Sequence, residues 1–308
     1  MSKLPDSLSN LRVIRDNQRY STYKAEYHDA PVFAKLVKAP ALRAGIRREI
    51  WGIQAFRQLA DAKDLGFAIP EMIASGDDYV VTSWAEGQPI DFSPESADFD
   101  DHIQFFATSL AQIDMLAYMA TPQPGEPDTA PKDIRSRIDT LKSRLETTAY
   151  GDYFDQTLIE KGFEYLYQNT GTLTTRFTHA DFTPGNVLEH DGRRTLVDYE
   201  SVSSSWPRFY DVVNLTINRI VSQPELVPGC LQIIERYFSV NTATSLVFAM
   251  PQMNVIAMLR SLSLIWEHLT EPNDHHNTQA AMTNQVRDRL IASIEQILAG
   301  KSYFEAFE

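Results

Sequence analysis

The chain has little of what stabilises extracellular proteins or anchors a protein in a membrane. Its 308 residues include one cysteine, Cys230, so neither an intramolecular disulfide nor a cysteine cluster for structural zinc can form. No segment approaches the roughly 18 uninterrupted apolar residues of a membrane span, and residues 1–15 contain no apolar core of a secretory signal. These absences predict a cytoplasmic protein without a membrane partner.

Basic residues are outnumbered: 28 Lys and Arg stand against 41 Asp and Glu, which gives a formal net charge of -13. This balance disfavours a nucleic acid partner and favours a cationic ligand or a metal ion. The 43% hydrophobic and 22% charged residues are ordinary for a globular protein. The length suggests two domains, or one domain of two lobes.

Sequence typical of β-strands is concentrated between residues 11 and 84. Runs rich in Val, Tyr, Thr and Phe predict strands at 11–14, 20–27, 31–37 and 78–84, with a hairpin turn at 28–30. Between the third and fourth runs, apolar residues recur every three to four positions over 41–59, which predicts an amphipathic helix. Residues 1–87 are therefore expected to form a first lobe of one small sheet and one main helix.

Residues 88–308 are expected to form a larger and mostly helical lobe. Gly87, Pro89 and Pro94 make residues 85–94 the best connection between the lobes. Helical spacing of apolar residues then predicts helices over 99–119, 131–148, 154–167, 212–220, 231–238, 247–269 and 279–298. One β-type island, at 176–199, interrupts the helices and contains the densest polar chemistry of the chain.

The polar residues of interest in this β-type segment are His179, Asp181, Asn186 and Asp198. Asp191-Gly192 is a strong hairpin-turn signal between two apolar runs, and a turn centred near residue 192 places position 186 opposite position 198. The amide oxygen of Asn186 and the carboxylate of Asp198 would then meet as two oxygen ligands suited to Mg²⁺.

Asp181 precedes Asn186 by five residues, in a loop bent by Pro184-Gly185. Such a loop can hold a carboxylate a few ångströms from a metal ion, where it accepts a proton from a hydroxyl and orients that hydroxyl for attack on a phosphoryl group. The island thus predicts phosphotransfer with Asp181 as the catalytic base. We interpret His179 as a support of the catalytic loop, because the carboxylate is better placed to act as the base.

The order His-x-Asp-x-x-x-x-Asn, followed twelve residues later by an Asp between apolar neighbours, resembles the catalytic loop and metal-binding Asp of the protein kinase-like fold. Residues 179–188 and 197–200 resemble the aminoglycoside phosphotransferase and choline kinase family more closely than protein kinases. The resemblance implies an α+β, two-lobed protein kinase-like fold. Its N-lobe would be a small antiparallel sheet with one main helix, and its C-lobe would be larger and mostly helical.

The resemblance extends to the first lobe. Residues 32–36 resemble the strand whose lysine, here Lys35, holds the nucleotide phosphates, and Glu49 matches the glutamate that pairs with it. Residues 79–87 resemble the last strand and the hinge beside the adenine, which implies that Trp84 and Glu86 lie near the nucleotide. Residues 1–87 would be the nucleotide-binding lobe and 88–308 the catalytic and substrate-binding lobe. The ordinary alternative for Lys35 and Glu49 is a surface lysine and a solvated glutamate.

The implied activity is that of a small-molecule kinase. It would transfer the γ-phosphoryl group of ATP or GTP, with Mg²⁺ held by Asn186 and Asp198, to a hydroxyl of an aminoglycoside, an amino sugar or an amino alcohol such as choline. The acceptor would be cationic or amine-bearing, in keeping with the net charge. Glu200 would be a further metal or substrate contact, and Asp211 resembles the aspartate that steadies the catalytic loop in this family.

Two other functions are compatible with the same residues. Residues 16–21, between the first two predicted strands, lack the glycine that lets a loop approach phosphates closely, which suggests a nucleotide-binding pseudokinase or scaffold without turnover. A metal-dependent phosphohydrolase could instead use His179, Asp181 and Asp198, and it would need no nucleotide-binding lysine.

Residues 267–276 combine acidic and histidine side chains near the C-terminus. His275 and His276, near His268, permit a transition-metal site, although a solvated loop is the more ordinary interpretation. Glu267 and Asp274, with Glu271, could also form an acidic rim that attracts an amine-bearing substrate.

Overall fold

The structure is a computed structural model, and it describes residues 4–119, 125–127, 133–270 and 283–306. The chain forms two compact units. Unit 1 consists of Met1–Asp91, Leu116–Ala130 and His179–Ser204, and unit 2 of Phe92–Met115, Pro131–Thr178 and Ser205–Glu308. The loop around Asp181 therefore belongs to the same compact unit as the N-terminal sheet. The lobe boundary predicted at residue 87 would instead place this loop in the second lobe.

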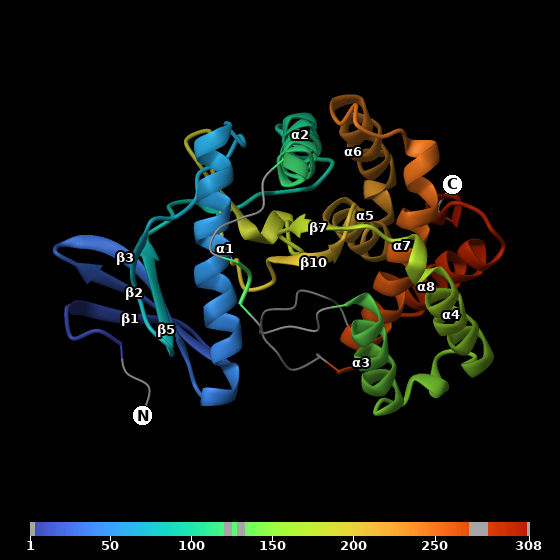
Figure 1. The fold of residues 1–308 in the computed structure, drawn as a ribbon, viewed down its shortest axis with the longest axis horizontal. Helices are drawn as coiled ribbons and strands as arrows, with labels where there is room; N and C mark the ends of the chain where they lie inside the picture. Colours follow the sequence, from blue (N-terminus) through green and yellow to red (C-terminus); the bar gives the residue numbers. More distant parts are fainter. Residues whose placement is uncertain (1–3, 120–124, 128–132, 271–282, 307–308) are drawn as a thin grey trace. The chain divides into compact units, whose positions relative to one another are not determined.

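Unit 1 is built on an antiparallel sheet of five strands in the order β1-β2-β3-β5-β4 (Figure 1). The strands are β1 (Leu8–Asp16), β2 (Tyr20–Tyr27), β3 (Ala30–Val37), β4 (Met72–Ser75) and β5 (Tyr79–Ser83). Helix α1 (Arg43–Ala62) lies beside this sheet and buries Ile46, Ile53 and Phe56 at helical spacing. The predicted sheet and main helix of the first lobe are thus confirmed, while β4 is an addition.

A second sheet in unit 1 comprises β6 (Gln88–Pro89), β8 (Val187–His190) and β9 (Arg193–Leu196). Two connections fix it to the rest of the unit. The Ala68 N–H donates to the Arg194 carbonyl oxygen at 2.7 Å, and the Ile90 N–H donates to the Val187 carbonyl oxygen at 3.0 Å. The hairpin that carries the predicted metal ligands is therefore anchored by backbone hydrogen bonds on both strands.

The register of the β8–β9 hairpin differs from the prediction by one residue. Asp191 and Gly192 have φ angles of 47° and 71°, as expected for a two-residue hairpin turn. The turn is therefore centred between residues 191 and 192, and Asn186 lies opposite Val197, whose N–H donates to the Asn186 carbonyl oxygen at 2.9 Å. The prediction that position 186 faces Asp198 is wrong.

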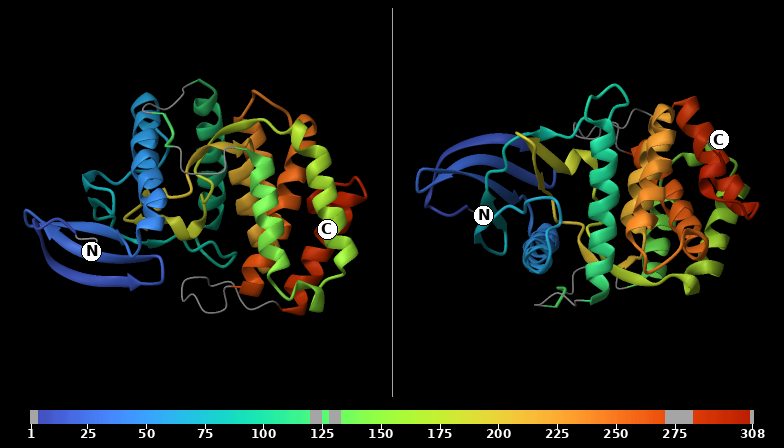
Figure 2. Two further views of the ribbon diagram at one scale, coloured as in Figure 1. Left: turned by 60° about the horizontal axis from the view of Figure 1, so that its bottom comes forward. Right: turned by 90° about the horizontal axis from the view of Figure 1, so that it is seen from above.

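Unit 2 is mostly helical. Its helices are α2 (Phe99–Met119), α3 (Ile134–Glu146), α4 (Gln156–Asn169), α5 (Tyr210–Ser222), α6 (Val227–Val240), α7 (Leu246–Thr270) and α8 (Asn284–Leu298), with the last residues of α2 assigned to unit 1. Strands β7 (Thr175–Thr178) and β10 (Ser203–Pro207) pair. Helix α7 packs against α3, α4, α5 and α8, and the further views show these helices gathered together (Figure 2). The predicted antiparallel-sheet N-lobe and helical C-lobe are confirmed.

Short 3₁₀ helices complete the secondary structure, at Pro40–Leu42, Tyr150–Asp152, Thr170–Thr172, Pro184–Asn186, Pro224–Leu226 and Tyr303–Ala306. Among the residues that the structure describes, α7 is the one helix long and apolar enough to cross a membrane by length and composition. Of its most apolar window, 72% is buried inside the protein, and Arg260 on this helix pairs with Glu267 at 2.9 Å. Burial of this extent is typical of the core helix of a globular unit.

Candidate active site

Lys35 lies at the centre of a cluster of charged side chains in unit 1. It is carried by β3, between β2 and β5. Its Nζ lies 2.9 Å from Glu49 Oε2, 3.2 Å from Asp198 Oδ1 and 3.0 Å from Glu200 Oε2. Helix α1 and the segment after β9 thus bring three carboxylates to one lysine.

Burial governs the charges of this cluster. Lys35 is 6% exposed and Glu49 is 4% exposed, which excludes the interpretation of the pair as solvated surface residues. Desolvation works against the charged form of Lys35, but attraction to Asp198, Glu49 and Glu200 prevails and holds the pKa of Lys35 well above its ordinary value. Burial raises the pKa of Glu49, although Lys35 opposes that change. Lys35 therefore keeps its positive charge at neutral pH.

Asp181 and Asn186 are joined by hydrogen bonds within one short loop. The amide nitrogen of Asn186 donates to Asp181 Oδ2 at 2.7 Å and to the carbonyl oxygen of Asp181 at 2.9 Å. The loop bends because Ala180 has a φ of 65° and Pro184–Asn186 form a 3₁₀ turn. The Asp181 carboxylate is thus held in one orientation by the side chain of Asn186.

Asp198 reaches the Lys35 cluster through a turn of the backbone. Its φ of 62° lies in the left-handed region, and its carboxylate pairs with Lys35 while its side chain stays 40% exposed. Asn186 contacts Asp181 instead. In the structure Asn186 and Asp198 contact two different side chains, and the hairpin register places Val197 opposite Asn186. Their joint role as Mg²⁺ ligands stays a prediction.

The oxygen atoms of this region suit a hard divalent cation. Glu49, Asp198 and Glu200 offer carboxylate oxygens within 4.8 Å of one another. The amide nitrogen of Asn186 is engaged by Asp181, so its amide oxygen is the atom that can bind a cation. Carboxylate and amide oxygens are the ligands that Mg²⁺ prefers, and the residues therefore fit Mg²⁺ by their chemistry.

His179 lies in the core of unit 1. It has no exposed surface, and its ring centroid lies 5.1 Å from that of Tyr199, 5.5 Å from that of Phe56 and 6.1 Å from that of Phe182. Desolvation lowers the pKa of His179 to about 3, with partial opposition from a hydrogen bond with the Asp181 backbone. A neutral, packed imidazole favours a supporting role for His179 rather than that of a base.

This burial predicts how stability depends on pH. The pKa of His179 is about 3 in the folded chain, against an ordinary value of 6.5, so the unfolded chain binds a proton between these values that the folded chain does not. Stability is therefore expected to fall as pH falls through this window, by about 1 kcal/mol per pH unit from this group, and not to change on its account above it.

The measurement is urea unfolding between pH 6.5 and pH 5. His179→Gln should make the free energy of unfolding less dependent on pH in this range. His190→Gln, at a histidine whose side chain is 57% exposed, is the matched control for the loss of a histidine. An unchanged slope in His179→Gln would show that the imidazole does not titrate as inferred.

Trp84 and Glu86 lie apart from the charged cluster. On β5, Val80 pairs with Lys35, so Trp84 is four residues further along, or roughly 13 Å at 3.3 Å per residue. The Lys24 Nζ lies 4.1 Å from the centroid of the half-buried Trp84 ring, and Glu86 is exposed. Both residues follow the end of β5, where the resemblance implies that the base of a nucleotide would bind.

Sequence reasoning missed Arg19, the residue before β2, and Tyr20, the first residue of that strand. An Arg19 guanidinium nitrogen lies 3.2 Å from Glu200 Oε1, and the Lys35 Nζ lies 4.5 Å from the centroid of the Tyr20 ring. Burial raises the pKa of Tyr20 to about 12, so its phenol stays neutral. The one sequence signal for these contacts was the lack of glycine in the loop before β2. Arg19 and Tyr20 follow in that segment, and their side chains make the contacts.

The remaining residues singled out in the sequence have other surroundings. Asp211 is buried in the first turn of α5 in unit 2. Glu267 pairs with Arg260, and His268 is buried. Glu271, Asp274, His275 and His276 lie outside the described residues. A transition-metal site or an acidic rim in this segment stays a prediction.

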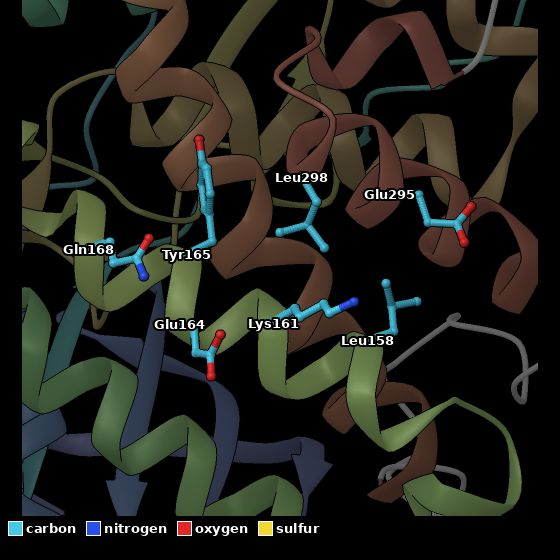
Figure 3. Close-up of a pocket in the computed structure, with 7 residues that line it drawn as sticks. All are labelled: Leu158, Lys161, Glu164, Tyr165, Gln168, Glu295 and Leu298. Carbon is cyan, nitrogen blue, oxygen red and sulfur yellow. The ribbon is translucent and has the colours of Figure 1, made fainter.

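Unit 2 also has an open cavity of about 530 Å³ between α4 and α8 (Figure 3). Its lining residues are Leu158, Lys161, Glu164, Tyr165, Gln168, Glu295 and Leu298. None of the residues predicted to act in catalysis lines this cavity. We therefore assign it no part in the reaction.

A family model and a set of solved structures match the chain. A model described as the phosphotransferase enzyme family matches residues 10–241. A comparison with curated proteins gave no match. The family match includes every predicted site residue from Lys35 to Asp198.

Solved structures similar to the chain include several aminoglycoside phosphotransferases. A thermostable mutant of APH(4)-Ia in a ternary complex with AMP-PNP and hygromycin B has a TM-score of 0.60 at 15% identity, covering 95% of this chain and 94% of that one. A GDP and kanamycin complex of APH(2'')-IIia has 0.58 at 15% identity, covering 96% and 94%. ADP-bound APH(2'')-Ib has 0.55 at 14% identity, covering 98% and 95%.

At these identities the solved structures establish the fold, and the family match, which spans most of the chain, establishes the family. The predicted class of enzyme is thereby confirmed: this chain belongs to the phosphotransferase enzyme family and is a phosphotransferase with an alcohol group as acceptor.

Proposed function

We propose that this phosphotransferase is a cytoplasmic small-molecule kinase that transfers the γ-phosphoryl group of ATP or GTP to a hydroxyl of an amine-bearing acceptor. One observation carries the proposal: the buried Lys35 is held by Glu49 and Asp198 in the same compact unit as the Asp181–Asn186 loop. The phosphohydrolase alternative would not need a nucleotide-binding lysine, whereas a kinase binds the nucleotide phosphates with such a cation.

Each residue has a defined part in the proposed reaction. Asp181 accepts the proton of the acceptor hydroxyl as the new O–P bond forms and the nucleoside diphosphate leaves. Lys35, positioned by Glu49, binds the nucleotide phosphates. Asn186 and Asp198 would hold Mg²⁺, which supplies positive charge to the transferred group when bound.

Two further sites complete the proposal. His179 supports the catalytic loop from the core of unit 1, as its burial indicates. Trp84 and Glu86, after the end of β5, would lie beside the base of the nucleotide. The similar solved structures with AMP-PNP, GDP or ADP support a nucleotide as donor.

The acceptor is proposed to carry amines as well as a hydroxyl. A net charge of -13 favours a cationic small molecule over nucleic acid or an anionic membrane. The solved complexes of similar proteins with hygromycin B and kanamycin support the same class of acceptor. Aminoglycosides, amino sugars and amino alcohols such as choline are therefore the acceptors to test.

The test is a turnover assay of the purified full chain with ATP or GTP, each with Mg²⁺ or with a chelator. The acceptor panel contains the three amine-bearing classes together with neutral sugars as controls. We expect nucleoside diphosphate release that requires both Mg²⁺ and an amine-bearing acceptor, with one phosphoryl group added to the acceptor by mass spectrometry. Release of inorganic phosphate without acceptor phosphorylation would indicate a phosphohydrolase, and nucleotide binding without turnover a scaffold.

A further inference from the structure

The loop between β1 and β2 uses its own backbone donors. Asn17 Oδ1 accepts hydrogen bonds from the backbone N–H groups of Arg19 and Tyr20, both at 2.8 Å. The N–H of Asn17 donates to the Tyr20 carbonyl oxygen at 3.0 Å. A loop that binds phosphate through its backbone needs N–H groups that point at the anion. The N–H groups of Asn17, Arg19 and Tyr20 are satisfied within the loop, so these three groups are not donors to a nucleotide.

Arg19 offers a side-chain donor beside Lys35. A guanidinium nitrogen of Arg19 lies 3.2 Å from Glu200 Oε1, and Glu200 Oε2 lies 3.0 Å from Lys35 Nζ. One carboxylate therefore bridges the two cations, while 53% of the Arg19 side chain is exposed. Guanidinium groups bind carboxylate and phosphate oxygens with the same paired geometry. The same two cations can therefore bind a phosphate group.

Tyr20 holds the two cations near each other. Its ring centroid lies 4.9 Å from the Arg19 guanidinium carbon and 4.5 Å from Lys35 Nζ, both within the range of a cation–π contact. Its hydroxyl accepts a hydrogen bond from Arg19 at 3.2 Å and lies against Gly45, where a Cβ would collide with it. The cations are thus arranged before a ligand binds, which lowers the entropic cost of binding.

We propose that Arg19 binds the nucleotide phosphates together with Lys35, and that its guanidinium replaces the backbone amides of the loop in this role. The inference rests on the proposed function, since it requires a nucleotide donor. It gives the glycine-free loop a part in nucleotide binding.

The experiment is calorimetric titration of the full chain with ATP in Mg²⁺ and, separately, with adenosine. Arg19→Ala is expected to weaken ATP binding by about 10- to 100-fold, the range for a lost hydrogen bond to a charged group. Adenosine affinity should stay the same because adenosine has no phosphate. The ATP affinity of Arg19→Lys should lie between those of the unaltered protein and Arg19→Ala, because lysine keeps the charge but loses the paired donors.

Arg47→Ala is the matched control. Gly45 and Glu49 lie one helical turn apart on the face of α1 that meets the cluster, whereas the exposed Arg47 lies on the opposite face. This variant should bind ATP as the unaltered protein does.

The outcomes separate this inference from the proposed function. Equal ATP affinity in Arg19→Ala and the unaltered protein would overturn the role of Arg19 alone. Equal losses of ATP and adenosine affinity would also overturn it, because they would indicate damage to the loop rather than a lost phosphate contact. Failure of the unaltered protein to bind any nucleotide would overturn the proposed function and the role of Arg19 with it.

Discussion

Replacement of Asp181 by Asn is expected to lower the turnover number by about 10²- to 10⁴-fold, the range for loss of a general base, while nucleotide affinity stays nearly unchanged. The substitution removes the proton acceptor but keeps the size of the side chain. An amide oxygen at position 181 can still accept the hydrogen bond that Asn186 now donates at 2.7 Å. The loop should therefore keep its conformation, and the loss should appear in turnover rather than in ATP binding.

The matched control is the same chemical change at Asp191. Its side chain is 88% exposed at the turn of the β8–β9 hairpin, and Asn tolerates its positive φ of 47°. Asp191→Asn should leave turnover and ATP affinity unchanged. Steady-state kinetics with the best acceptor, together with calorimetry, compare the two variants. Full turnover in Asp181→Asn would show that another group accepts the proton.

Apolar periodicity was sufficient for the longer elements of the fold. The helix predicted over 99–119 has these bounds in the structure, because its buried residues recur at a period that only a helix satisfies. Strand β4, at Met72–Ser75, was not predicted. It is four residues long and has no fully buried residue, so pairing with β5 rather than its own sequence stabilises it.

The hairpin shows how a correct turn can accompany a wrong register. Asp191-Gly192 was identified as the turn, but a shift of its centre by half a residue changes the partner of Asn186 from Asp198 to Val197. In a regular strand such a shift sends a side chain to the opposite face of the sheet. Asp198 still joins the Lys35 cluster because its positive φ redirects the chain after β9. The sequence alone does not predict that this aspartate has a positive φ.

The contacts of Arg19, Tyr20 and Glu200 could not be predicted for a different reason. Each depends on the space that other segments leave. Tyr20 is buried beside Lys35 because Gly45, on α1, has no side chain to exclude the phenol. Local sequence reports the type of a side chain and its strand, whereas its partners are set by packing between segments that are far apart in the chain.

Asp198→Asn is expected to abolish the increase in ATP affinity that Mg²⁺ produces and to reduce turnover by about as much as loss of the base does. The carboxylate of Asp198 pairs with Lys35 at 3.2 Å and stays 40% exposed, so it can face both the lysine and a bound cation. Removal of its charge weakens a cation site, but it also removes a repulsion toward phosphate oxygens. In a chelator, the variant should therefore bind ATP at least as tightly as the unaltered protein.

Asn is the informative replacement at this position because of the backbone. A φ of 62° is readily adopted by Asn, whereas Ala there would add a conformational cost of about 1–2 kcal/mol. ATP titrations of both proteins with Mg²⁺ and with a chelator give the result, with Asp191→Asn again as the control. If Mg²⁺ strengthened ATP binding equally in Asp198→Asn and in the unaltered protein, Asp198 would serve only to position Lys35, and the cation would have to be held by the remaining oxygens of Glu49, Asn186 and Glu200.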